Sequence, residues 1–133
     1  MQRSRTVHHV TNQEITVAQC LMKHFKLGPE EVESLFKLGA IYSDKKRVLE
    51  NRMLAKGTYL RVHLQPKRFG AAKIDWKSCI VADHPEFLIV NKPPGIPVHA
   101  SLENREENVL NQMRLATGYP LLITQRLDNP VGG

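Results

Sequence analysis

The segment Pro66–Ala72 constrains this fold most, because it interrupts the 133-residue chain near its middle. It contains a strand-ending proline, a glycine and small residues, and its apolar residues follow neither helical nor strand periodicity. A chain of this length forms one ordinary domain or two small ones. The sequence therefore predicts an α+β protein with a tail at 1–13, a first domain at 14–66, a linker at 67–73 and a second domain at 74–133.

Composition excludes several classes of protein. The chain is 41% hydrophobic and 24% charged, which is neither collagen-like nor typical of disorder. It has no apolar run close to the roughly 18–20 residues of a membrane-spanning helix, so we expect no membrane partner. Cys20 and Cys79 belong to no CxxC or Cys/His cluster, which indicates a reducing intracellular compartment and no structural zinc. The histidines show no ligand spacing, and we expect surface or core roles for them: His8, His9, His24, His63 and His84.

The net charge of +6 is concentrated in the first half of the chain. Residues 1–73 hold 14 Lys or Arg against 6 acids, giving +8, whereas residues 74–133 hold 5 against 7, giving −2. A basic half of this kind favours contact with a polyanion, because each cation placed on a phosphate releases counterions. A solvated basic face is the alternative on charge alone.

Apolar spacing predicts two short helices and two strands in the first domain. The first helix covers residues 15–25 and ends at Leu27-Gly28, where we expect the glycine to take positive φ. The second begins at Pro29 and ends at Gly39. The residues at helical spacing on one side of the first helix are Val17, Cys20, Leu21 and His24, and the buried stripe expected on the second is Val32, Leu35 and Phe36.

Strands are expected on either side of a basic connection. Ala40–Tyr42 predicts one strand, followed by the polar turn Ser43–Lys46. Residues 59–64 alternate and predict a strand that is half buried and half basic. Its two expected faces are Leu60, Val62 and Leu64 on the buried side, and Tyr59, Arg61 and His63 on the other.

The second domain is expected to begin near Ile74. Cys79–Ala82 and Phe87–Val90 predict a hairpin apolar enough to be buried on both faces. Residues 91–99 contain three prolines and predict a stiff, extended loop. The last predicted elements are a helix containing Val109, Leu110, Met113 and Ala116 that stops at Gly118, and a buried strand starting at Leu121-Leu122-Ile123.

The first domain resembles a small RNA-binding domain named after a small-subunit ribosomal protein, the S-four-like domain. The resemblance is carried by the two helices, Gly39-Ala40-Ile41-Tyr42, the Lys/Arg-rich turn and residues 56–62. In that family the second helix and the following strand and turn form a surface for structured RNA. The matching positions are Lys37, Lys45, Lys46, Arg47 and Arg52. An unrelated small α+β domain is the alternative.

The second domain carries a further resemblance. Ile80 to Asp83, Phe87 to Pro93 with Gly95 and His99, and the later Arg126-Leu127-Asp128 resemble RNA pseudouridine synthases of the ribosomal large subunit synthase A family. The resemblance implies a mixed, mainly antiparallel catalytic domain that isomerises uridine to pseudouridine in rRNA or tRNA. It implies RNA as the partner, a monomer, and no metal or other cofactor.

The same resemblance implies roles for three residues. Asp128 matches the nucleophilic carboxylate, although an aspartate that starts a turn after a strand is the ordinary alternative. Arg126 matches the arginine that occupies the place of the flipped uridine, and a structural ion pair is its alternative. Lys92 matches the loop that borders the catalytic site, where we expect it to position RNA and take no part in chemistry.

Departures from the family pattern shape the remaining expectations. Gln125 stands where many members have histidine. After the aspartate the family usually has two variable residues, a threonine, a small or acidic residue and a glycine. This sequence keeps only the glycine, Gly133, where it stops. We therefore expect a truncated synthase with little activity alone, in the cytoplasm, nucleus or an organelle. A non-catalytic RNA-binding remnant is the alternative.

Overall fold

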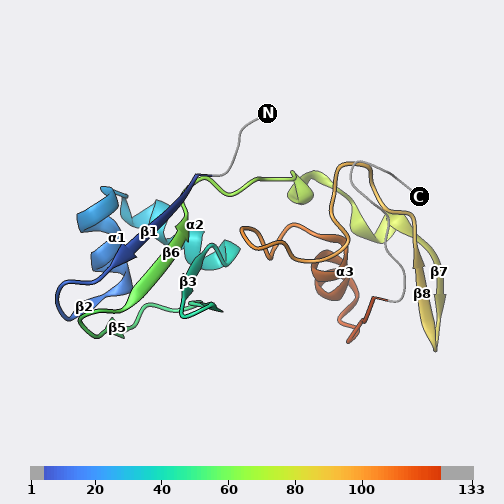
Figure 1. The fold of residues 1–133 in the computed structure, drawn as a ribbon. Helices are drawn as coiled ribbons and strands as arrows, with labels where there is room; N and C mark the ends of the chain where they lie inside the picture. Colours follow the sequence, from blue (N-terminus) through green and yellow to red (C-terminus); the bar gives the residue numbers. More distant parts are fainter. Residues whose placement is uncertain (1–4, 124–133) are drawn as a thin grey trace. The chain divides into compact units, whose positions relative to one another are not determined.

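The computed structural model of the chain describes residues 5–123, which form two compact units (Figure 1). The first unit extends to Lys67 and includes Leu102–Asn104, and the second begins at Arg68. Each unit has its own hydrophobic core. The described part of the chain contains no helix long and apolar enough to cross a membrane.

A four-stranded antiparallel sheet organises the first unit. Its strand order is β1-β6-β3-β4, and a separate two-stranded pair joins β2 to β5. The structure confirms the strands predicted at 40–42 and 59–64 to within one residue. The bounds are β1 Thr6–Val10, β2 Ile15–Thr16, β3 Ile41–Ser43, β4 Lys46–Arg47, β5 Met53–Leu54 and β6 Tyr59–His63.

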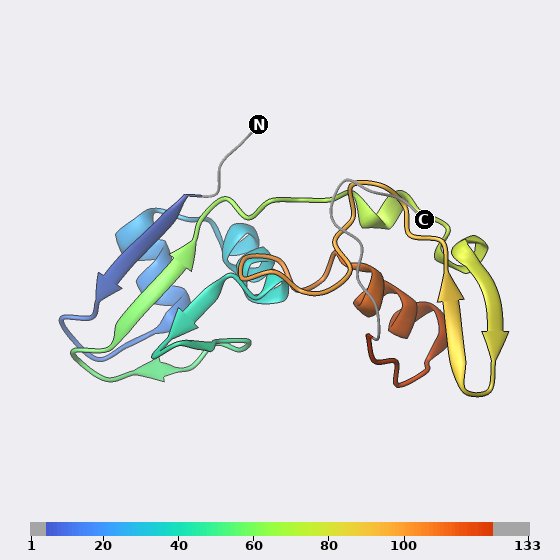
Figure 2. The ribbon, with the colours of Figure 1, turned by 45° about the vertical axis from the view of Figure 1, so that its right-hand side comes forward.

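Helices α1 (Val17–Phe25) and α2 (Pro29–Leu38) cover one face of this sheet (Figure 2). Helix α1 begins two residues later than predicted because Thr16 caps it. The Thr16 hydroxyl accepts from the Gln19 N–H at 3.2 Å, and the Gln19 amide oxygen accepts from the Thr16 N–H at 3.3 Å. Of the residues expected on these helix sides, Val17, Cys20, Leu21, Val32 and Leu35 are buried, whereas His24 and Phe36 are half-buried.

The connection between the two helices differs from the prediction. Lys26, not Gly28, takes the left-handed conformation that ends α1, with φ of 56°. Gly28 has φ of −77° and lies at the start of α2, where its N–H donates to the Glu31 carboxylate at 3.2 Å. The two positions exchange roles because α2 begins immediately at Pro29, which requires an extended residue before it.

Residues 6–10 form strand β1, although the sequence placed them in a tail. The strand pairs with β6 over its whole length, from Thr6 opposite His63 to Val10 opposite Tyr59. Its alternate residues are half-buried, and Val7 packs against the first core. The sequence signal was weak because this strand is short and histidine-rich, and its pairing partners lie 49 to 57 positions further along the chain.

The second unit contains a hairpin and one helix around a small core. Strands β7 (Ile80–His84) and β8 (Phe87–Val90) form the hairpin, and α3 spans Val109–Thr117. The predicted helix and its stop are confirmed, because Gly118 takes φ of 74° and its N–H donates to the Arg114 carbonyl. Short 3₁₀ helices at Ala71–Lys73 and Trp76–Cys79 complete the core, whose buried residues are Ala71, Trp76, Ile96 and Met113.

The segment after Lys67 is held in the second unit by Glu107. This buried carboxylate accepts from the Arg68 guanidinium, from the Phe69 N–H at 3.3 Å and from the Ala71 N–H at 3.0 Å. Burial of a carboxylate is tolerated here because both of its oxygens have donors. Much of the segment expected to be a free linker is therefore fixed to the unit that follows it.

Two expectations about strands in the second unit are wrong. The hairpin is not buried on both faces, because Val81, Phe87 and Ile89 are 67%, 52% and 48% exposed while Leu88 and Val90 pack inward. Only one face has described residues packed against it. Leu121-Leu122-Ile123 forms no strand, because the described part of the chain pairs no other strand with it. The Arg114 guanidinium instead donates twice to the Leu121 carbonyl.

Candidate functional site

A tight turn projects two lysines from the end of the sheet. Asp44 and Lys45 connect β3 to β4 with φ of 50° and 66°, and positive φ at both central residues is the geometry of a two-residue type I′ hairpin. Ser43 pairs with Lys46 across this turn. The side chains of Lys45 and Lys46 are both exposed, so the hairpin presents two adjacent positive charges to solvent.

A row of four side chains crosses the sheet on the face opposite the helices. The antiparallel register places His8 of β1 opposite Arg61 of β6, Arg61 opposite Tyr42 of β3, and Tyr42 opposite Arg47 of β4. Residues directly opposite each other project from the same face of a sheet. The core residues Ile41, Leu60 and Val62 alternate with this row, which we call the cross-strand row.

Tyr42 fixes the two arginines of the cross-strand row. The Arg47 Nε donates to the Tyr42 hydroxyl at 2.8 Å, and that hydroxyl donates to the Leu102 carbonyl. The Arg61 guanidinium carbon lies 4.6 Å from the centroid of the Tyr42 ring, and that of Arg47 lies 5.7 Å from it. Cation–π contacts of this kind orient guanidinium groups without removing their charge.

His63 does not add charge to this face, contrary to the predicted basic side of its strand. It is only 8% exposed, and its Nδ1 is hydrogen-bonded to the Thr6 hydroxyl at 3.1 Å. Burial lowers the pKa of His63, and the Arg61 guanidinium lowers it further. His63 is therefore neutral near pH 7, whereas Arg61 stays charged. The sequence alternation placed Arg61 on this face, but the S-four-like resemblance did not include it among the RNA-binding positions.

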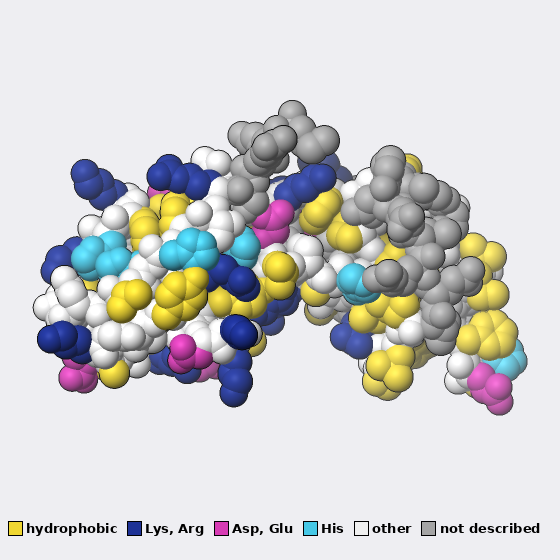
Figure 3. Space-filling view, viewed as in Figure 1, with side chains coloured by type: hydrophobic (Ala, Val, Ile, Leu, Met, Phe, Trp, Pro, Cys, Tyr) yellow, Lys and Arg dark blue, Asp and Glu magenta, His cyan; other side chains and the backbone are white. Residues whose placement is uncertain are grey.

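The predicted RNA-binding residues of the first unit come from three elements. Lys45, Lys46 and Arg47 are brought together on the β3–β4 hairpin. Lys37 is exposed on the last turn of α2, and Arg52 is exposed just before β5, where its carbonyl accepts from the Val17 N–H at 2.9 Å. Lysine and arginine side chains are frequent on the face of the first unit drawn in Figure 3.

Lys92 occupies a different environment from the other predicted cations. It is 4% exposed, and its ammonium donates to the carbonyls of Pro93 at 3.1 Å and Ile96 at 3.0 Å. Burial lowers the pKa of Lys92. Its side chain thus fixes the proline-containing loop from within, and a role of Lys92 in positioning RNA stays a prediction. Arg126 and Asp128 lie outside the described residues.

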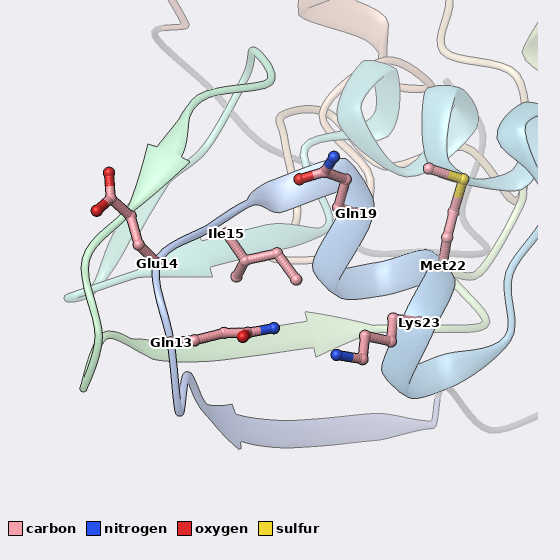
Figure 4. A pocket seen from close by; sticks show the side chains of 6 residues that line it. All are labelled: Gln13, Glu14, Ile15, Gln19, Met22 and Lys23. Atoms are coloured by element: carbon pink, nitrogen blue, oxygen red, sulfur yellow. The ribbon is translucent and has the colours of Figure 1, made fainter.

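An open surface depression lies at the start of α1 (Figure 4). It is lined by side chains that precede the helix and by the exposed side of its first two turns. None of the predicted site residues contributes to it, and its lining holds one carboxylate and one ammonium, which is an ordinary mixed surface. The lining residues are Gln13, Glu14, Ile15, Gln19, Met22 and Lys23.

The fold also brings together three residues that the sequence left apart. One ligand atom each from His9, Cys20 and His24 lies within 4.8 Å of the other two. The expectation that neither cysteine belongs to a Cys/His cluster is therefore wrong for Cys20, which lies beside two histidines in the folded chain. Cys20 and His24 are four positions apart and share one side of α1, a spacing that indicates adjacency once the helix is accepted. His9 was missed because strand β1 was missed.

The described first unit is thus a small α+β module with a basic, aromatic sheet face and a lysine-bearing turn, which suits a polyanionic partner. No family model and no solved structure matches the chain. Over part of its length, however, the chain is similar to proteins named RNA pseudouridine synthases.

Three such relatives show the extent of the similarity. RNA pseudouridine synthase 6, chloroplastic, of Oryza sativa subsp. japonica is 39% identical over 82 residues, covering 59% of this chain and 17% of the relative. The Arabidopsis thaliana protein of the same name is 40% identical over 86 residues, covering 62% and 18%. An uncharacterized RNA pseudouridine synthase of Helicobacter pylori is 25% identical over 126 residues, covering 85% and 38%. The chain thus spans less than a fifth of the plant relatives.

Proposed function

We propose that this chain is part of an RNA pseudouridine synthase of the large subunit synthase A type, in which the first unit is an S-four-like domain that binds structured RNA. The observation that carries this proposal is the similarity, at 39% and 40% identity, to two plant proteins named as RNA pseudouridine synthases. The Arg126-Leu127-Asp128 motif supports the same assignment from residues that the structure does not describe.

The RNA-binding half of the proposal rests on the cross-strand row and the lysine turn. Arg47 and Arg61 are oriented by Tyr42, and a planar guanidinium forms paired hydrogen bonds to phosphate or stacks on a base. Lys45 and Lys46 supply point charges beside them. Such a surface recognises the shape and charge of folded RNA and requires little sequence information.

The catalytic half of the proposal assigns the nucleophile to Asp128 and uridine displacement to Arg126. In the reaction the bond from the uracil nitrogen to the ribose breaks, the base turns over, and a carbon of the ring bonds the ribose in its place. The ring carbon loses one proton and the ring nitrogen gains one, so the change is an isomerisation with no net oxidation. Flipping the uridine costs a few kcal/mol, which Arg126 offsets by filling the gap.

Two further properties belong to this proposal. The substrate is a uridine in rRNA or tRNA, handled by a monomer that needs no metal or other cofactor for the reaction itself. The compartment is intracellular, and the chloroplastic names of the two plant relatives favour an organelle.

RNA binding without catalysis is the second candidate, because the cross-strand row and the lysine turn lie entirely within the first unit. Pseudouridine formation on transcribed rRNA and tRNA fragments separates the two candidates. Product from this chain above that of Asp128→Ala, even in the small amount expected of the chain alone, would support catalysis, and Asp75→Ala is the matched control because Asp75 is exposed and its side chain makes no helix-cap bond. Equal product from the chain and Asp128→Ala would contradict catalysis and leave the binding function.

A further inference from the structure

We propose that His9, Cys20 and His24 form a site for one Zn²⁺ ion that fastens strand β1 to helix α1. The three ligand atoms all lie within 4.8 Å of one another. Two imidazoles and one thiolate are a donor set that zinc prefers, and three protein ligands leave a fourth position for water. The proposal concerns the architecture of the first unit and does not depend on the chemistry of Asp128.

The fold explains why these three side chains meet. Strand β1 alternates, with His8 exposed on one face and His9 half-buried on the other, so His9 projects toward α1. On α1, the spacing of Cys20 and His24 places both on the side that faces the strand. The His9 and His24 rings have centroids 4.2 Å apart, and Phe25 packs edge-on against His9 at 5.9 Å.

One polar atom in this cluster lacks the partner that burial normally demands. The Nε2 of His9 is buried and makes no hydrogen bond to any described residue. Buried ring nitrogens are ordinarily hydrogen-bonded, and those that are not call for an explanation such as an ion. A cation held between the three side chains and bound through Nε2 would give this nitrogen a partner.

The dimensions suit zinc after small side-chain adjustments. Bonds of about 2.0–2.1 Å to nitrogen and 2.3 Å to sulfur place two nitrogen ligands and one sulfur ligand of a tetrahedral ion roughly 3.3–3.6 Å apart. The separation of up to 4.8 Å therefore has to close by about 1 Å, which rotation of the histidine side chains supplies. Cys20 is fully buried, whereas His9 and His24 are half-buried, so an ion can enter past the two rings.

Zinc at this position would stabilise the edge of the sheet. Strand β1 is an edge strand that pairs only with β6 in the described part of the chain. A bond network from His9 to two residues of α1 would tie that strand to the helix beneath it. Because the ion binds the folded site, zinc should raise the melting temperature of the chain.

Zinc titration of the full chain, first freed of metal with a chelator, tests this site. When the chain competes with a chromogenic chelator for zinc, we expect it to bind one Zn²⁺ per chain. When Co²⁺ replaces zinc, we expect a charge-transfer absorption band from the thiolate to the cobalt ion. Removing a residue that only hydrogen-bonds to a metal ligand costs roughly 10–100-fold in metal affinity. Replacing a ligand itself should therefore weaken zinc binding at least about tenfold in each ligand variant. The ligand variants are Cys20→Ser, His9→Gln and His24→Gln, and their matched controls are Cys79→Ser, His8→Gln and His84→Gln.

Equal zinc affinity for the ligand and control variants would overturn the proposal, as would a cobalt complex without a thiolate band or the absence of stoichiometric binding. A measurement on the unmodified chain covers the case in which a ligand variant does not fold. Zinc added to the metal-free, unmodified chain should raise its melting temperature, because the ion binds only the folded site. An unchanged melting temperature at saturating zinc would also overturn the proposal.

Discussion

Tyr42 is the residue on which the proposed RNA surface depends. It is only 5% exposed, and its hydroxyl both accepts from Arg47 and donates to the Leu102 carbonyl, so the buried oxygen is satisfied. The faces of its ring hold the charge of Arg61 in place. A guanidinium that is already oriented loses less side-chain entropy when it meets a phosphate.

His63 makes the stability of the first unit depend on pH. Its pKa is lowered in the folded chain, first by burial and then by Arg61, so the unfolded chain binds more protons as the pH falls below about 6.5. The contribution of neutral, buried His63 to the stability of the first unit is therefore fully present above that pH. It is lost as the pH falls toward the pKa that His63 has in the folded chain. The smaller influences on this pKa are Glu103, which raises it, and Arg47 and His8, which lower it.

Urea unfolding between about pH 7.5 and 5.5, with a chelator present, measures this dependence. We expect the free energy of unfolding to decrease on acidification, and to decrease less in His63→Gln. His84→Gln is the matched control, since His84 is exposed on the β7–β8 hairpin. A pH dependence that is unchanged in His63→Gln would contradict this role of burial.

Sequence alternation predicts which face of a strand a long side chain leaves from, but not where its charged end lies. The sequence placed Arg61 on the exposed side of its strand because alternation fixes which way a strand residue projects. It gave no means to determine that the ammonium of Lys92 turns inward to two carbonyls of its own loop. A four-carbon side chain reaches either solvent or backbone from the same Cα position, and packing decides between them.

Helix α1 ends on a residue that its backbone conformation disfavours. Lys26 has φ of 56°, where an L-residue with a Cβ is less stable than glycine by roughly 1 kcal/mol. We therefore expect Lys26→Gly to raise the free energy of unfolding by about 1 kcal/mol. Lys23→Gly, inside the same helix, should instead lower it by about 1 kcal/mol. Urea denaturation checks both, and a loss of stability in Lys26→Gly would show that its side-chain contacts outweigh the backbone strain.

Elements with local signals could be predicted, and elements defined by distant partners could not. The two helices of the first unit followed from apolar spacing, Pro29 and Gly39, which act within a few residues of each other. Strand β1 depends on pairing with β6 across the chain, and Leu121-Leu122-Ile123 lacks a described partner despite its apolar sequence. Strand formation is settled by pairing and burial, which a single segment does not encode.

On the scale of the whole molecule, the excess of basic residues acquires a structural location. The +8 of residues 1–73 predicted a polyanion-binding half, and the first unit presents part of that charge on the lysine turn and the cross-strand row. The candidate site could be predicted for Lys45, Lys46 and Arg47, which lie together. The Cys/His cluster could not, because it joins a helix to a strand that was not expected.

RNA affinity as a function of salt tests the central claim that this surface binds RNA. The full chain should bind a structured rRNA fragment with an affinity that falls steeply between about 50 and 200 mM salt. Each lysine on a phosphate contributes about 0.7–0.9 to the slope of log affinity against log salt, so the double variant Lys45→Gln/Lys46→Gln should lower the slope by roughly 1.4–1.8. Lys73→Gln/Lys77→Gln, which removes the same charge from exposed positions of the second unit, should leave the slope nearly unchanged. Equal slopes for the two double variants, or no binding by the unmodified chain, would contradict the account.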